Sequence, residues 1–223
     1  SENTELHGWM GQLYQGIVER DIFYRKRFSE RHLFMNFSSC ILSLSGSTVS
    51  PSSIANYITS KEEKMVRSTA YAYLDALEQA YLVTKIPRYD ITGKKCLATL
   101  QKYYAIDPGF ITVNRNGKTD DNMGIVLETV VCNELLSRGY EVFIGKKRES
   151  EVDFIACKEG KRCYIQVAYL LADPKTIERE FGGFKNIRDN YPKYVLSLDK
   201  FDFSRDGIIH MNIIDFLMEK KDL

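Results

Sequence analysis

Apolar residues recur at helical spacing through the first eighty residues of the chain. Residues 13–27 and 31–44 each carry apolar side chains three and four positions apart, which predicts two helices. Ser50 followed by Pro51 is typical of a helix start, and a short apolar face follows it. A further apolar stripe predicts a longer helix over residues 66–80.

The pattern then changes to extended segments. Residues 82–91 and 96–106 predict two strands, and the turn between them contains Gly93. A short helix, a turn, a longer helix and a hairpin form the order of a winged helix-turn-helix domain, which we assign to residues 31–112. Residues 1–30 are predicted to be a helical linker from an upstream module.

The second half, residues 122–223, alternates helical and strand patterns. Met123–Ser137 predicts a helix, three strand-like runs follow, and a helix, two strands and a terminal helix complete the chain. The predicted fold class is therefore α/β (α+β): a winged helix-turn-helix domain followed by a mixed sheet that helices flank.

A winged helix binds DNA through the exposed face of its second helix and through its hairpin loop. The residues predicted to face DNA are Lys64, Arg67, Ser68, Tyr71, Asp75, Arg88, Lys94 and Lys95. With 31 basic and 30 acidic residues, the net charge of +1 gives no overall attraction to nucleic acid, so any contact depends on a local patch. A solvated face of mixed charge is the alternative interpretation.

Composition narrows the classes of protein. At 44% hydrophobic and 27% charged, the chain has the makeup of a folded domain, and it contains neither a long apolar run nor a signal peptide. Five cysteines without a C-x-x-C pair favour reduced core residues, and the three histidines belong to no nucleophile signature. We expect a cytoplasmic protein that does not bind membranes.

One group of polar residues shows candidate chemistry. If residues 159–160 form a two-residue turn, cross-strand partners have numbers that sum to 319, as 159 and 160 do. Asp153 then lies opposite Gln166, and Glu151 lies opposite Ala168, with all four on one face.

A carboxylate of the preceding helix, Glu128 or Glu134, extends this group. Clustered oxygen ligands suit a magnesium ion, which holds a phosphate and activates a water for phosphodiester cleavage. The alternative interpretation is that Asp153 and Gln166 form a structural hydrogen-bonded pair, and that Glu128 makes a cap or an ion pair within its helix.

These residues resemble the restriction-endonuclease-like PD-(D/E)XK core, in which an Asp is followed by Glu-x-Lys. The resemblance implies that Glu128, Asp153 and Gln166 occupy catalytic positions, with Asp153 and Glu128 as metal ligands. Where that family has Glu-x-Lys, this sequence has Gln166, Val167 and Ala168. The catalytic lysine is therefore absent, unless Lys146 or Lys147 replaces it.

The whole chain resembles the C-terminal half of a bacterial and archaeal family of predicted AAA-type ATPases. The likeness covers residues 12–218 and is carried by SPSSIANYI, YLDALEQAYLVTKIPRYDITGKK, KYYAIDPG, VLETVVCNELLSRGYEVFIGK, EVDFIA, YIQVAYLL and EREFGGFKNIRDNYPKYVLSLD. It implies an upstream ATPase module, which would bind ATP. This sequence has no G-x-x-x-x-G-K-[ST] motif, so we expect a fragment of a longer protein.

Three functions follow from these patterns. The first is a DNA-associated region of an ATPase, with a degraded nuclease-like domain and no cofactor of its own. The second is a magnesium-dependent deoxyribonuclease with a rearranged site. The third is a module that regulates the ATPase or binds another protein, which we expect if the second domain covers the face bearing Arg67, Arg88, Lys94 and Lys95.

Overall fold

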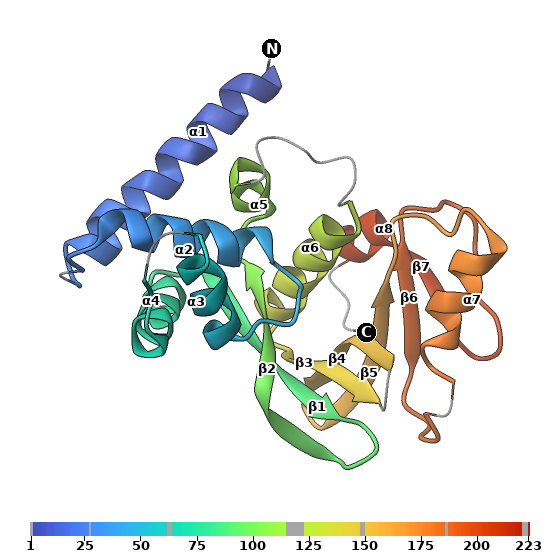
Figure 1. Ribbon diagram of the computed structural model, residues 1–223. Helices are drawn as coiled ribbons and strands as arrows, with labels where there is room; N and C mark the ends of the chain where they lie inside the picture. The colour runs from blue at the N-terminus through green and yellow to red at the C-terminus, as the bar shows by residue number, and fades with distance from the viewer. Residues whose placement is uncertain are drawn as a thin grey trace. The chain divides into compact units, whose positions relative to one another are not determined.

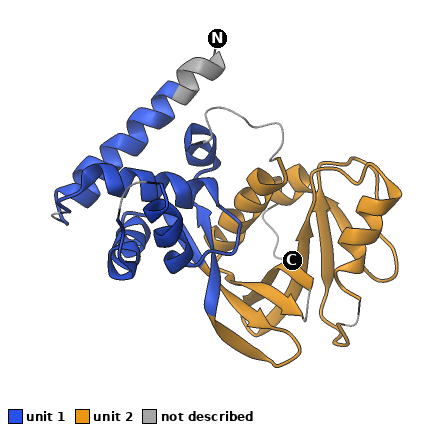
Figure 2. Ribbon diagram, viewed as in Figure 1, with its two compact units in different colours: residues 1–85, 99–122 blue, residues 86–98, 123–223 orange. Residues whose placement is uncertain are grey.

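The chain forms two compact units. Unit 1 contains residues 1–85 and 99–122, and unit 2 contains residues 86–98 and 123–223 (Figure 2). The computed structural model describes residues 2–26, 28–61, 64–114, 123–147, 150–185, 187–219 and 223. No helix within these residues is long and apolar enough to cross a membrane.

Unit 1 is mainly helical. Its helical elements are α1 (Glu2–Ile17), the π-helical η1 (Val18–Phe23), α2 (Arg31–Ser43), α3 (Pro51–Thr59), α4 (Arg67–Gln79) and α5 (Pro108–Asn114) (Figure 1). Aromatic rings fill its core: Tyr73 of α4 packs against Phe34 and Phe37 of α2 with ring centroids 5.0 and 5.8 Å apart. Such pairs add to the stability gained from burial alone.

Helical spacing predicted α2, α3 and α4 to within a residue or two. The predicted cap is confirmed, because the Ser50 hydroxyl accepts the Ser53 N–H at the start of α3. One prediction was wrong, because the first helix begins at Glu2 rather than at residue 13. In addition, α5 is a helix that the pattern did not predict.

Helix α1, within the predicted linker of residues 1–30, packs against other helices of unit 1. The Tyr14 hydroxyl donates to Ser38 Oγ at 2.7 Å, and both groups are buried. The Tyr14 ring also lies 6.2 Å from that of Phe110 in α5. Burial of these side chains ties α1 to α2 and α5.

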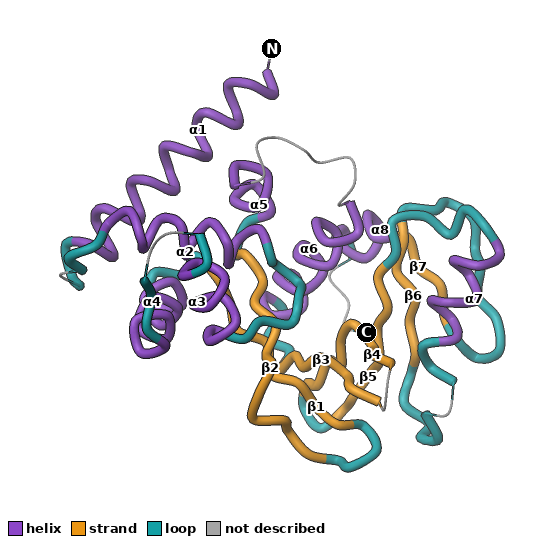
Figure 3. The backbone as a smooth tube through the Cα atoms, viewed as in Figure 1, coloured by secondary structure: helices purple, strands orange, loops and turns teal. Residues whose placement is uncertain are grey.

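A seven-stranded mixed sheet confirms the predicted α/β class, a mixed sheet that helices flank. Its order is β2-β1-β3-β4-β5-β6-β7, with β3, β4 and β5 antiparallel and the pairs β1–β3, β5–β6 and β6–β7 parallel (Figure 3). The strands are β1 (Val83–Asp90), β2 (Lys95–Ala105), β3 (Glu141–Lys147), β4 (Ser150–Lys158), β5 (Lys161–Val167), β6 (Lys193–Ser197) and β7 (Ile209–Asn212). Three helices complete unit 2: α6 (Met123–Ser137), α7 (Pro174–Gly182) and α8 (Ile213–Met218).

The predicted hairpin of β1 and β2 is divided between the units. Its outer part, residues 86–98, belongs to unit 2, because Arg88 to Asp90 pair in parallel with Ile144 to Lys146 of β3. This division differs from the predicted domains 31–112 and 122–223. The winged-helix interpretation stays a prediction.

Both faces of the unit 2 sheet are covered. On one face, Ile155 and Tyr164 pack with Phe181 of α7 and Phe184 beyond it, a group that we call the α7-side core. Phe154 and its cross-strand partner Ile165 are fully buried outside this group. Since side chains alternate across a sheet, they face the other side, where α6 contacts β3, β4 and β5.

A β-bulge interrupts this alternation at the start of β4. Phe143 of β3 is paired with Ile155, whereas Gly145 is paired with Val152, so β4 has one extra residue opposite Ile144. The bulge places Val152 in the α7-side core together with Ile155. The residue before it, Glu151, therefore faces the opposite side, and the prediction that Glu151 shares a face with Asp153 was wrong.

Candidate functional site

A cleft of about 1080 Å³ in unit 2 gathers the residues that the sequence pattern grouped. It lies where β4 begins and β5 ends, beside α6 and α7, and its lining includes Glu128, Glu151, Asp153 and Gln166. The turn at residues 159–160 sets this register as expected, since Phe154 pairs with Ile165 and Lys158 with Lys161. Both turn residues have positive φ, 51° and 77°, as a two-residue hairpin requires.

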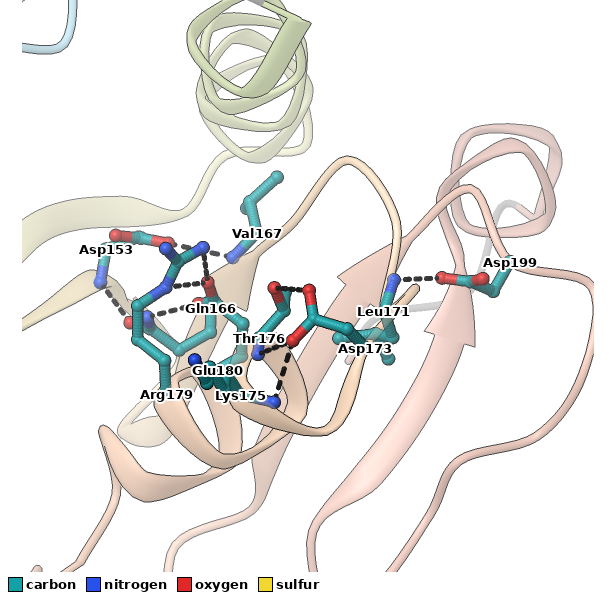
Figure 4. A network of polar contacts seen from close by, with 10 residues as sticks. All are labelled: Asp153, Gln166, Val167, Leu171, Asp173, Lys175, Thr176, Arg179, Glu180 and Asp199. Atoms are coloured by element: carbon teal, nitrogen blue, oxygen red, sulfur yellow. Dashed lines mark hydrogen bonds and ion pairs between the residues drawn. The ribbon is translucent and has the colours of Figure 1, made fainter.

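Asp153 and Gln166 bond to each other's strands. The Asp153 N–H donates to Gln166 Oε1 at 2.8 Å, and the Val167 N–H donates to Asp153 Oδ2 at the same distance (Figure 4). These two side chains thus take the place of carbonyl groups in the ladder just beyond the last regular pair of β4 and β5. These bonds agree with the interpretation of Asp153 and Gln166 as a structural hydrogen-bonded pair.

The amide of Gln166 continues the network to α7. Its Nε2 donates to Glu180 Oε2 at 3.0 Å, and Arg179 donates to the other Glu180 oxygen at 2.8 Å through Nε (Figure 4). Glu180 is 5% exposed. A buried carboxylate is stable only when it is paired and hydrogen-bonded, which both partners provide.

Sequence reasoning missed Glu180. The one available signal was its position in α7, where it precedes the buried Phe181 on a strongly amphipathic helix. Nothing in the local pattern distinguishes a buried Glu at such a boundary from an exposed one, because its partner Gln166 lies 14 residues away on a strand.

Glu151 pairs with Arg88, which is a correction to both predictions. Arg88 was expected to face DNA from the wing, but its side chain is 7% exposed and donates to Glu151 Oε1 at 3.1 Å. The bulge explains the pairing, because it directs Glu151 toward the face from which Arg88 projects. Glu134, the alternative helix carboxylate, pairs with Arg138 at 2.7 Å.

Position 168 carries no cation. Ala168 is buried in the α7-side core, and neither Lys146 nor Lys147 is among the described residues that line the cleft. Basic side chains reach the cleft from α7 and the segment after it: Lys175, Arg179 and Lys185. Lys146 and Lys147, the predicted substitutes, therefore do not replace the lysine that nucleases of this type have at position 168.

The described residues of the cleft do not fit a magnesium ion. Asp153 and Glu151 are engaged by Val167 and Arg88, and no group of three His, Cys, Asp or Glu residues in the described part of the chain is placed to hold a metal. Glu128 also lines the cleft. One turn further along α6, burial of the Cys132 thiol raises its pKa, and the negative charge of Glu128 adds to this shift. Magnesium in proteins is usually bound through one or two carboxylates together with water molecules, and here the protein's own donors compete for the carboxylates of Asp153 and Glu151.

The start of α7 is closed by its own cap. Asp173 accepts the N–H groups of Lys175 and Thr176 and the Thr176 hydroxyl. The Thr176 bonds are the main cause of the lowered pKa of Asp173. The helix terminus is therefore satisfied within the chain.

A second polar network, beside β6 and β7, was also not expected. His210 Nε2 lies 2.9 Å from Ser197 Oγ, and Ser197 donates to Asp199 Oδ2 at 2.7 Å. Ser197 is fully buried and its proton points to Asp199, so this is not the arrangement of a hydrolase triad. Burial lowers the pKa of His210, while the charges of Asp199 and Asp202 oppose that shift.

The other residues predicted to contact DNA are exposed. Lys64, Arg67 and Ser68 lie at the start of α4, and Lys94 and Lys95 lie at the end of the hairpin turn. Tyr71 is 56% exposed, and Asp75 forms an ion pair with Lys26 at 2.9 Å. The pair offsets the negative charge on this face of α4.

Comparisons with known proteins place the chain among relatives. A family model described as "Domain of unknown function (DUF8612)" matches residues 1–120. An "Uncharacterized protein" of Haemophilus influenzae is 34% identical over 208 residues, 93% of this chain and 51% of that protein. "Uncharacterized protein MJ1544" of Methanocaldococcus jannaschii is 31% identical over 179 residues, 75% of this chain and 39% of that protein. The chain thus spans about half, or less, of these relatives.

A solved structure was also matched. "Crystal structure of protein VC1899 from Vibrio cholerae" covers 83% of this chain and 52% of that chain, with 11% identity and a TM-score of 0.28. An agreement this low carries no argument about fold or function.

Proposed function

The chain belongs to the family described as Domain of unknown function (DUF8612), and from that premise we propose that it is a DNA-associated region of a predicted AAA-type ATPase. In this proposal unit 2 is a nuclease-like platform that binds DNA without cutting it. The resemblance over residues 12–218 supports the ATPase assignment. The length of the relatives supports it as well, because they leave room for a module upstream or downstream.

One observation carries the proposal that the platform does not cut DNA. The polar side chains that a nuclease would direct at a metal are directed here at protein groups: Asp153 at the Val167 N–H, Gln166 at the Asp153 N–H and Glu151 at Arg88. Each of these bonds satisfies a donor of the protein. A metal ion would compete with these bonds for the same side chains, and a buried donor that loses its acceptor is costly.

The exposed cations support DNA contact over a purely protein-binding role. Of the four residues whose exposure was to separate these functions, Arg67, Lys94 and Lys95 are exposed and only Arg88 is covered. Arg88 is covered by Glu151, which lies in the predicted second domain and in the same compact unit as Arg88, so this residue alone meets the criterion for a protein-binding role. Phosphate contacts need basic side chains that reach solvent.

Fluorescence anisotropy with a labelled DNA duplex tests the proposal. We expect binding at low salt, with log affinity falling linearly as log salt rises. The variant Lys64→Gln/Arg67→Gln should bind more weakly, with a salt slope reduced by about one for each phosphate contact that is lost.

The matched control is Lys161→Gln/Lys200→Gln, which removes the same charge from exposed positions outside the predicted DNA face. It should retain the wild-type slope. If the wild-type chain does not bind duplex DNA even at low salt, the DNA-associated function is wrong.

A further inference from the structure

A second hollow of unit 2 has three basic residues in its lining. It has a volume of about 650 Å³ and lies at the tip of the β1–β2 hairpin. None of its described lining residues belongs to the cleft. Its charged lining residues are Lys94, Lys147, Arg188 and Asp189, and Ile91, Thr92 and Ile187 complete it. Three elements distant in the sequence therefore bring basic groups together.

The hairpin tip is fixed against β3. The Ile91 N–H donates to the carbonyl oxygen of Lys146 at 2.9 Å, which extends the parallel pairing of β1 and β3 by one residue. The Asp90 carboxylate closes the turn by accepting the N–H groups of Thr92 and Gly93, each at 3.0 Å. Lys94 is thereby held beside the end of β3, where Lys147 lies.

The third segment that lines the hollow, residues 187–189, is also held in place by packing and hydrogen bonds. Ile187 is buried in the α7-side core, against which Ile91 also packs. Asp189 accepts the Tyr164 hydroxyl at 2.6 Å and the Tyr191 N–H at 3.3 Å. Arg188 is exposed and lies between these two fixed residues.

The charge of the hollow suits an anion. Among the described lining residues there are three basic side chains and one carboxylate, and that carboxylate already accepts hydrogen bonds from two protein donors. Arginine and lysine are the side chains that bind phosphate oxygens, the first through a planar fork and the second as a point charge. Positions held by a sheet and a core need little reordering when the ligand binds.

We propose that this hollow binds phosphate groups, and that in the DNA-associated function it holds the phosphate backbone of DNA. The inference rests on the proposed function for the identity of its ligand. A volume of about 650 Å³ lies within the range of ligand sites and exceeds what one phosphate needs, which favours consecutive phosphates of a strand over a single ion.

Two titrations test this inference with the variant Lys94→Gln/Arg188→Gln and the control Lys161→Gln/Lys200→Gln. Anisotropy with duplex DNA should show a lower affinity and a salt slope reduced by about two for the hollow variant only. In the second titration, inorganic pyrophosphate is added and the backbone amide NMR signals are followed. Signals of Thr92, Lys94 and Arg188 should shift in the wild type, and those of Thr92 should not shift in the hollow variant.

The outcomes separate this inference from the proposed function. If DNA binds and the hollow variant matches the control, the hollow does not hold the DNA backbone and the inference is overturned. If the wild type binds no DNA, the proposed function fails, and the pyrophosphate titration decides the hollow alone. NMR shifts confined to residues of the hollow then support a site for a free phosphate, and the absence of such shifts overturns the proposal of a phosphate site. Unchanged melting temperatures for both variants exclude misfolding as the cause.

Discussion

Asp153 acts as a structural residue of the sheet. Its carboxylate accepts the N–H of Val167, a residue that is 5% exposed, at the point where the regular ladder of β4 and β5 ends. A side chain in this role contributes to stability whether or not it is charged. A metal ligand behaves in the opposite way, because removal of its charge relieves repulsion and often stabilises the protein.

Substitution of Asp153 separates the two roles. Asp153→Ala should lower the free energy of unfolding by about 1–3 kcal/mol, because it leaves the Val167 N–H buried and unsatisfied. Asp153→Asn keeps an acceptor of the same shape and should cost less. Urea denaturation measures both. An Ala variant as stable as the wild type would contradict the structural role.

His210 predicts a pH dependence of stability. Its pKa is lowered in the folded chain by burial, so the unfolded chain binds the proton more readily. The stability that depends on neutral His210 is therefore fully present above its ordinary pKa of about 6.5 and is lost as the pH falls through the lower pKa of the folded state.

The measurement is urea denaturation from about pH 8 to about pH 5, the range that spans this titration. His210→Gln should lose part of the decline in stability seen at acidic pH. The exposed His32 provides the control, since His32→Gln should keep the wild-type profile. Identical pH profiles for wild type and His210→Gln would show that His210 does not cause the decline.

The sequence predicted that Asp153 and Gln166 lie together, but not the bonds that they make. Asp153 and Gln166 were found because a two-residue turn fixes the register of the strands that it joins. Glu180 and the pairing of Ser197 with His210 were missed, because each depends on packing between elements that no turn connects. Local patterns contain no information on such contacts.

At the scale of elements, the β4–β5 turn sets the register on which the cleft depends. Glu159 and Gly160 both have positive φ, and a Cβ added to Gly160 would meet no atom within 4 Å. Substitution at 160 therefore changes the backbone energy alone. Glu159 occupies a position at which Asn is preferred in type I′ turns.

Two single variants test the turn in opposite directions. Gly160→Ala should lower the free energy of unfolding by about 1–2 kcal/mol, the usual cost of the left-handed region for a residue with a Cβ. Glu159→Asn should raise it by a few tenths of a kcal/mol, because Asn tolerates positive φ better. Thermal unfolding compares the two, and a change in the same direction for both would contradict this turn geometry.

Periodicity predicted most elements, and its failures have physical causes. Strict alternation placed Glu151 beside Asp153, but the bulge at the start of β4 turned Glu151 to the opposite face, where it meets Arg88. The parallel pairing of β1 with β3 joins segments more than fifty residues apart. Local alternation predicts a hairpin but not the strand that it pairs with. Only the folded sheet shows that the outer part of the hairpin belongs to unit 2.

For the whole molecule, the account combines two claims about DNA. Exposed cations at α4 and the hairpin tip are proposed to bind it, and the cleft is proposed not to cut it because its polar side chains hold the sheet together. Binding without cleavage distinguishes this account from a rearranged nuclease and from a module that binds only proteins.

A single gel of supercoiled plasmid, incubated with excess protein and either Mg²⁺ or Mn²⁺, tests both claims. Half of each sample is loaded directly, and half after the protein is digested. We expect retarded plasmid in the first half and intact supercoiled plasmid in the second. Nicked or linear plasmid that disappears with Asp153→Ala, once that variant is shown to be folded, would contradict the account.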